Sequence, residues 1–164
     1  MQPMQPYPTS GQEPEPQRPP MPNSVNTAVK LMYAGAALSL IELIVSLATV
    51  GSLKTAITNK YPHYTSTQVH SAELVIIVGV VIEAIIAIGL WLWMARANAA
   101  GRNYARITGT VFFGIYTLFL LLSLRRPEAS VGLVFSLLVW LTGLGAVIML
   151  WRKDSGPYFT PRTQ

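Results

Sequence analysis

Cysteine is absent from the 164-residue chain, which excludes disulfide bonds, thiolate metal sites and a cysteine nucleophile. Histidine is scarce as well. His63 and His70 both lie outside the long apolar stretches, so we expect no haem held by histidine inside a membrane. No P-loop, nucleophile elbow, zinc-protease motif or glycine-rich dinucleotide loop occurs. We therefore predict that the protein is not an enzyme and has no catalytic residue, no metal site and no cofactor.

Charged residues are also few, at 12% of the chain, whereas 51% of the residues are hydrophobic and the mean hydropathy is +0.41. The apolar residues gather in four runs, each long enough to cross a hydrocarbon core of about 30 Å at about 1.5 Å per residue. We predict an all-α integral membrane protein with four transmembrane helices in an antiparallel bundle. The four-helix domain is expected over residues 27–151, with spans near 31–50, 74–94, 105–124 and 131–151.

The two ends of the chain have a different composition. Eight of the twelve prolines fall within the first 23 residues, among Gln, Ser and Glu, and such a segment buries too little apolar surface to fold. We predict a disordered, proline-rich cytoplasmic tail over residues 1–26, interpreted as a solvated spacer, with a docking motif as the alternative. Residues 152–164 are predicted to form a short cytoplasmic tail. No signal-peptide pattern opens the chain, so the first span is expected to act as its own insertion signal.

The basic residues predict the orientation in the membrane. Eight of the twelve Lys and Arg residues fall on the side of the termini and four on the other side, so the positive-inside rule places both termini in the cytoplasm of a plasma membrane. Their scattering in ones and pairs argues against nucleic-acid binding. We expect the partner of these charges to be a bilayer with anionic headgroups. The expected headgroup anchors are Arg96, Arg102, Arg106, Arg152 and Lys153.

The connection over residues 51–73 is the largest predicted feature outside the membrane. Ser52 to Asn59 could form two helical turns, Pro62 would stop them, and the run from Thr65 to Gln68 has the spacing of a capping box. We therefore expect a helix over about 66–96 that begins above the lipid. The short connection over residues 125–128 predicts a tight turn between antiparallel neighbours. His63 and His70 could form an outer metal or pH-sensing site with Glu73, but we favour a plain surface role.

Two carboxylates within the apolar runs are the most informative residues. An acidic side chain near the bilayer centre costs about 3 kcal/mol even on a lenient scale, so Glu42 and Glu83 should face the bundle. Counted from the outer ends of their antiparallel spans, they share a depth, and the same count reaches Tyr116 and Trp140. We predict a polar layer of these four residues. Because no Lys or Arg lies at that depth, at least one of the two carboxyls is expected to be protonated.

Two functions are consistent with this layer. In the structural interpretation, which we favour, the neutral acids form hydrogen bonds across the helix seams with each other, Ser39, Ser46 or Tyr116. In the other interpretation they bind a cation or relay protons. We therefore predict a non-enzymatic accessory or scaffold subunit of a membrane complex, with a protein partner or a homo-oligomer. The alternative is a small oligomeric proton- or cation-linked transporter or channel.

Several motifs resemble those of a family of small actinobacterial four-span membrane proteins with a Pro/Gln-rich N-terminal tail. The matching stretches are KLMYAGAALS at 30–39, LWLWMA at 90–95, GRNYAR at 101–106 and LWRKDS at 150–155, followed by Tyr158 and Phe159. The resemblance covers about residues 25–160. It implies the four-span topology and residence in a plasma membrane of actinobacterial type. It carries over no activity, substrate or catalytic residue, and Glu42 and Glu83 lie outside the matching motifs.

Overall fold

The computed structural model describes residues 20–124 and 131–160. These residues are helical apart from short connections, and no strand occurs among them. Most of the N-terminal tail and the connection over 125–128 lie outside the described residues, so the predictions of disorder and of a tight turn are not addressed. The described part contains six helices: α1 (Asn23–Ala48), α2 (Val50–Lys60), α3 (Ser66–Ala99), α4 (Asn103–Ser123), α5 (Val131–Leu150) and α6 (Gly156–Phe159).

Four of these helices, α1, α3, α4 and α5, are long and apolar enough to cross a membrane. The predicted fold class is therefore confirmed. Helices α1, α3 and α4 begin before their apolar runs, because helical hydrogen bonding includes the polar residues that precede them. Helix α1 begins at Asn23, directly after Pro22, so residues 23–26 belong to the helix and not to the predicted tail. Proline suits a helix start because an N–H at that position has no acceptor within the helix, so its absence costs no hydrogen bond.

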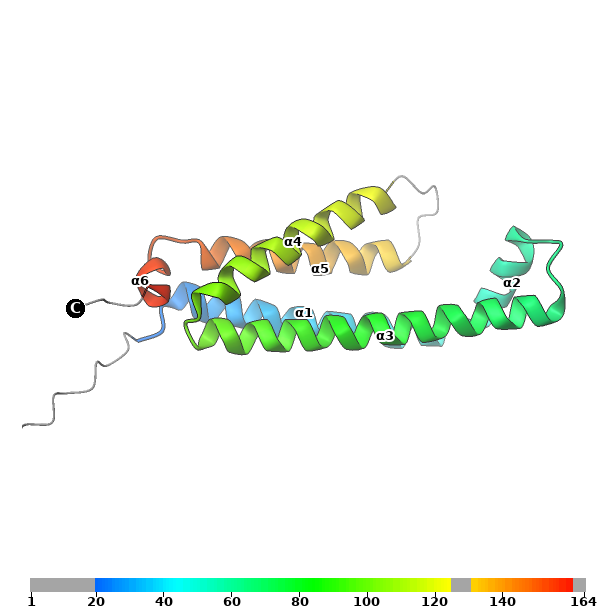
Figure 1. The fold of residues 1–164 in the computed structure, drawn as a ribbon, viewed down its shortest axis with the longest axis horizontal. Coiled ribbons are helices and arrows are strands. Elements are labelled where there is room, and N and C mark those ends of the chain that lie inside the picture. Colours follow the sequence, from blue (N-terminus) through cyan, green and yellow to red (C-terminus); the bar gives the residue numbers. More distant parts are fainter. Residues whose placement is uncertain (1–19, 125–130, 161–164) are drawn as a thin grey trace, which may run out of the picture.

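Helix α1 lies at the centre of the bundle and packs along both α3 and α5 (Figure 1). Small residues allow these close approaches, as is usual between helices in membranes. A Cβ at Gly35 of α1 would lie 2.7 Å from the Trp91 ring of α3, and one at Gly145 of α5 would lie 3.1 Å from Leu31 of α1. The bundle therefore rests on an α1–α3–α5 unit in close contact.

Helix α4 is attached to this unit at a different angle. Gly101, with φ at 66°, forms the turn between α3 and α4 and is the one described residue in the left-handed region. From this turn α4 runs obliquely, packing against α5 while its distance from α3 increases (Figure 1). Gly143 of α5 lies against Phe113 of α4, where a Cβ would come within 3.0 Å of the ring. The bundle is thus open between α3 and α4 at the end away from the termini.

The segment after α5, which falls in the predicted short cytoplasmic tail, packs against the bundle as far as residue 160. Residues 151–160 turn back across the bundle and end in α6 (Figure 1). The Ser155 hydroxyl is 2.7 Å from that of Ser24, the Tyr158 hydroxyl donates a hydrogen bond to the Ala99 carbonyl, and Phe159 is buried. These contacts join α6 to the start of α1 and the end of α3. The spacing of apolar residues in the sequence could not predict these contacts, because the segment is too short to show a helical period.

At the opposite end, α2 and the first turns of α3 extend beyond the ends of α4 and α5 (Figure 1). The predicted capping box of α3 is present: the Thr65 N–H donates to Gln68 Oε1 at 2.9 Å, and the Gln68 N–H donates to Thr65 Oγ1 at 3.4 Å. Helix α3 has 34 residues, about 51 Å at about 1.5 Å per residue, which exceeds a bilayer core. We call α2, residues 61–65 and the start of α3 up to Glu73 the projection.

Candidate intramembrane binding cleft

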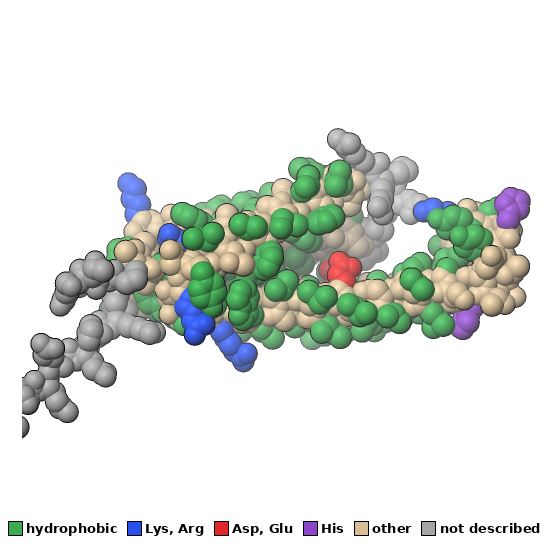
Figure 2. Space-filling model, in the orientation of Figure 1, with side chains coloured by type: hydrophobic (Ala, Val, Ile, Leu, Met, Phe, Trp, Pro, Cys, Tyr) green, Lys and Arg blue, Asp and Glu red, His purple; other side chains and the backbone are tan. Residues whose placement is uncertain are grey.

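A cleft of about 320 Å³ lies where α4 separates from α3. Side chains from all four long helices line it, and acidic side chains are visible in the hollow in Figure 2. Helices α1 and α5 form its floor, because they pack against each other beneath the opening. The cleft therefore exists because α4 follows α5 and leaves α3.

Glu42 of α1 and Glu83 of α3 both line this cleft. They meet because α1 and α3 are antiparallel and each carboxylate lies a similar number of residues from its outer end. Glu42 is half-buried and Glu83 is exposed within the isolated chain. No described side chain donates a hydrogen bond to either carboxyl, and no Lys or Arg lines the cleft. The hydrogen bonds expected under the structural interpretation are therefore absent from the described part of the chain.

Tyr116 also lines the cleft, but its hydroxyl donates to the Ser136 carbonyl of α5 at 3.2 Å. It holds α4 against α5 and is not bonded to the carboxyls. Trp140 does not line the cleft. Its indole N–H donates to Thr117 Oγ1 at 2.9 Å, so it belongs to the α4–α5 seam. Counting residues along the span predicts the depth of Trp140, but it does not predict the direction in which the side chain points around α5. That direction is toward α4 and not into the cleft.

The phenylalanines that line the cleft were not singled out from the sequence. Helix α4 contributes all three of them. Phe112, Tyr116 and Phe119 are spaced by four and three residues, which places them on one helix face; this spacing was the available signal. The aromatic residues that line the cleft are Trp91, Phe112, Phe113, Tyr116 and Phe119.

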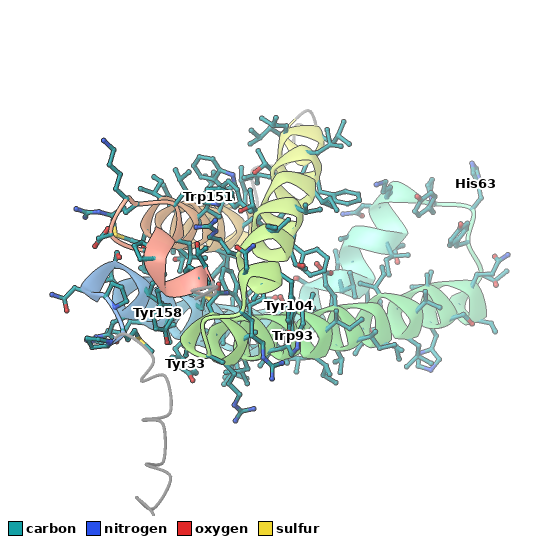
Figure 3. The ribbon with its side chains drawn as sticks, turned by 60° about the vertical axis from the view of Figure 1, so that its left-hand side comes forward. Tyr33, His63, Trp93, Tyr104, Trp151 and Tyr158 are labelled. Atoms are coloured by element: carbon teal, nitrogen blue, oxygen red, sulfur yellow. The ribbon has the colours of Figure 1, made fainter. Side chains whose placement is uncertain are left out.

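The predicted headgroup anchors gather at the end of the bundle that holds the termini, and they divide into two kinds. Arg96, Arg102, Arg152 and Lys153 are exposed and can reach headgroups. Arg152 lies 3.6 Å from Asp154, and the hydrogen bond from Arg102 to the Tyr104 hydroxyl at 3.0 Å raises the pKa of Arg102. Tyr33, Trp93, Tyr104 and Trp151, labelled in Figure 3, lie at the same end.

Arg106 differs from the other anchors. Its guanidinium carbon lies 4.2 Å from the centre of the Trp151 ring and 5.3 Å from that of Phe159, and its Nε atom is buried. The Trp151 indole N–H donates to Thr110 at 2.9 Å, which fixes the ring. Arg106 therefore joins α4 to α6 and to the residue that follows α5 through cation–π contacts, and its role as a headgroup anchor stays a prediction.

The histidines of the projection lie apart from each other. His70 Nδ1 lies 3.9 Å from a Glu73 oxygen on the same face of α3, while His63 lies on the connection at the far tip (Figure 3). Within residues 20–124 and 131–160 no three His, Asp or Glu side chains come together as metal ligands would. The surface role of the two histidines stays a prediction.

The fold and the cleft define a class: an all-helical, multi-pass membrane protein with a mostly apolar cleft between its spans that holds two carboxyls. Comparison with protein-family models, with curated proteins and with solved structures found no match. The resemblance to actinobacterial four-span proteins therefore stays a prediction.

Proposed function

We propose that this protein is a non-enzymatic accessory subunit of a membrane complex and that its projection binds the partner. The supporting observation is that the projection is folded but ends in exposed aromatic side chains. The rings of Tyr61 and Tyr64 stack with their centres 4.8 Å apart, and 43% of each side chain is exposed. Tyrosine is enriched at protein interfaces because it combines apolar area with a polar tip.

The projection has the rigidity that docking requires. Ile57 of α2 and Val69 of α3 are buried within it, at 5% and 4% exposed, and the capping box fixes the start of α3. A preformed surface binds at a lower entropic cost than a flexible one. We propose that the partner is the part of another membrane protein that lies outside the bilayer, where it can reach the tyrosine pair.

The proposed setting is a plasma membrane of actinobacterial type, with both termini in the cytoplasm and the projection outside. Support comes from the eight basic residues on the side of the termini against four on the other side, as the positive-inside rule requires. The exposed Arg96, Arg102, Arg152 and Lys153 would then meet anionic headgroups, each worth about 1 kcal/mol.

Affinity purification from native membranes in a mild detergent, followed by mass spectrometry, tests the accessory role. We expect a stoichiometric partner that is lost from the double variant Tyr61→Ala/Tyr64→Ala. The partner should remain with Glu42→Gln/Glu83→Gln, which leaves the projection intact. Absence of any stoichiometric partner contradicts the proposal. Retention by the tyrosine variant with loss on deletion of residues 1–19 would assign docking to the proline-rich tail instead.

The cleft carboxyls, which accept no hydrogen bond from a described side chain, favour a second candidate, a proton- or cation-linked transporter. Carboxyls within membrane spans are costly and rare, and those that occur often mark the path of an ion or a proton. In proteoliposomes, transport through this layer predicts a flux that Glu42→Gln/Glu83→Gln abolishes and that deletion of the tail leaves unchanged. An equal flux with both glutamines in place would dismiss this candidate.

A further inference from the structure

We infer that the cleft between α3 and α4 is a binding site for a small lipophilic organic cation, a substituted ammonium ion with an apolar body. The inference goes beyond the accessory role, because that role needs no small molecule. For the second candidate function, the transporter, the inference names the class of solute that would be carried. Four observations carry it: the size of the cleft, its charge, its aromatic walls and its position beside the lipid.

The size of the cleft suits a small molecule. A volume of about 320 Å³ falls in the range of small-ligand sites, about 300–1,000 Å³. A molecule with one ring and a branched headgroup matches a site of this size.

The charge of the cleft is of one sign. Among residues 20–124 and 131–160, Glu42 and Glu83 are the only ionisable lining residues besides Tyr116, and no Lys, Arg or His of these ranges lines the cleft. A carboxylate in this environment is stabilised by a cation from outside the chain, or else takes up a proton. A bound cation offsets the charge that the described residues leave unbalanced, so the ligand is expected to be positive.

The ligand atoms of the cleft favour an organic cation over a metal ion. Calcium takes six to eight oxygen ligands and magnesium requires about six. Beyond the two carboxyls, the lining offers hydroxyl groups from Ser39, Tyr116 and Ser136. Tyr116 already donates to the Ser136 carbonyl. These oxygens share the lining with rings and aliphatic side chains, a mixture that suits an ammonium group with apolar substituents better than a hard metal ion.

Aromatic rings complete the site. Trp91 of α3 and four rings of α4, those of Phe112, Phe113, Tyr116 and Phe119, line the same space as the carboxyls. Ring faces attract cations, and cages of aromatic residues are the usual receptors for quaternary ammonium groups. The combination of rings with carboxyls therefore recognises the charge and the apolar substituents of one molecule.

The opening of the cleft determines the route to it. The hollow between α3 and α4 opens at the side of the bundle (Figure 2), which is the surface that borders lipid when the four long helices cross a membrane. Phe119, a lining residue, is 66% exposed in the isolated chain. A solute that partitions into the bilayer can therefore enter sideways, and this requirement selects a lipophilic cation.

Equilibrium dialysis of the full chain in phosphatidylcholine nanodiscs against radiolabelled benzyltrimethylammonium tests the inference, with empty nanodiscs as background. We expect saturable binding that is at least tenfold weaker in Glu42→Gln/Glu83→Gln. Glu73→Gln is the matched control, because Glu73 lies on α3 outside the cleft, and it should bind within twofold of the wild type. Neopentylbenzene, which has the same shape without charge, should not compete.

A second variant tests the site without touching the carboxyls. Ala87 lines the cleft, so Ala87→Phe should fill part of it and weaken binding by a similar factor. Circular dichroism and size-exclusion chromatography check that every variant folds. Binding no greater than that of empty nanodiscs overturns the inference, as does equal binding by the glutamine variant or competition by neopentylbenzene. Light scattering is the last check. A wild type that is a dimer and binds no cation, together with a monomeric Glu42→Gln/Glu83→Gln variant, assigns the cleft to a second copy of the chain. That result also overturns the inference.

These outcomes are independent of the accessory role. The tyrosine variant of the projection leaves the cleft unchanged, so it should bind the cation like the wild type even if it loses its protein partner. Loss of cation binding with a retained partner rejects only the cleft inference. Loss of the partner with retained cation binding bears only on the projection.

Discussion

The indole ring of Trp91 on α3 lies so close to Gly35 on α1 that a Cβ at position 35 would come within 2.7 Å of ring atom Cε2. Trp91 also lines the cleft. The contact therefore links two features: it sets the spacing of the two helices that carry Glu42 and Glu83, and it holds one wall of the cleft in place. Small residues have this role in membrane helices because they let neighbouring surfaces approach closely.

Replacing Gly35 should destabilise the bundle. Gly35→Ala forces Trp91 or the whole of α3 to move, and overpacking of this kind costs about 1–3 kcal/mol. Unfolding followed by circular dichroism during titration with sodium dodecyl sulfate measures the change. Gly89→Ala is the matched control, because Gly89 lies in α3 and a Cβ added there would meet no neighbouring atom within 4 Å. Equal stability of the two variants would show that the contact is not tight.

Arg106 should matter for stability more than for lipid binding. Arg106→Ala removes its contacts with Trp151 and Phe159, which are worth about 0.5–2 kcal/mol depending on burial. Arg106→Lys should recover only part of this, since an ammonium lacks the planar surface that stacks on rings. The measurement is the midpoint of thermal unfolding. Arg96→Ala, at an exposed position of the same end, should change stability by less than about 0.5 kcal/mol.

The hydroxyl group of Tyr158 should help to hold the last helix in place. Tyr158→Phe removes the hydrogen bond to the Ala99 carbonyl and should cost about 1 kcal/mol. It should also increase proteolytic cleavage after residue 150, because α6 then releases more often. Tyr104→Phe serves as the control, since the Tyr104 hydroxyl accepts its bond from Arg102 at an exposed position. Unchanged proteolysis of Tyr158→Phe would mean that the burial of Phe159 alone retains α6.

The capping box should control the projection without affecting the bundle. Thr65→Ala removes the side-chain acceptor of the Gln68 N–H, and loss of an N-cap costs about 1 kcal/mol. Hydrogen exchange should accelerate severalfold at the first amides of α3 and stay constant in α1 and α5. Thr67→Ala, inside the first turn of α3, should leave exchange nearly unchanged. Faster exchange throughout the chain would show that the projection and the bundle unfold together.

Some of the cleft was predictable from the sequence and some was not. The equal depth of Glu42 and Glu83 follows from counting along antiparallel spans, and both line the cleft. The same count misplaced Trp140, because depth says nothing about the direction of a side chain around its helix. The phenylalanines of α4 were missed because apolar residues in a membrane span are expected everywhere. Only the angle of α4 distinguishes those that face the cleft from those that face lipid.

The sequence by itself determined the class of the protein. The sequence has four apolar runs of about twenty residues. Within a bilayer such a run forms a helix, because every backbone N–H and C=O must then find its hydrogen-bond partner inside the segment. The capping box at Thr65 and the helical turns after Ser52 were equally local and equally readable. Tertiary structure decided everything that depends on how helices meet. Contacts between distant residues placed α6 on the end of α3, enclosed Arg106 between two rings and left α4 apart from α3. Such packing depends on the shapes of surfaces brought together across the whole chain, which no local pattern of residues records.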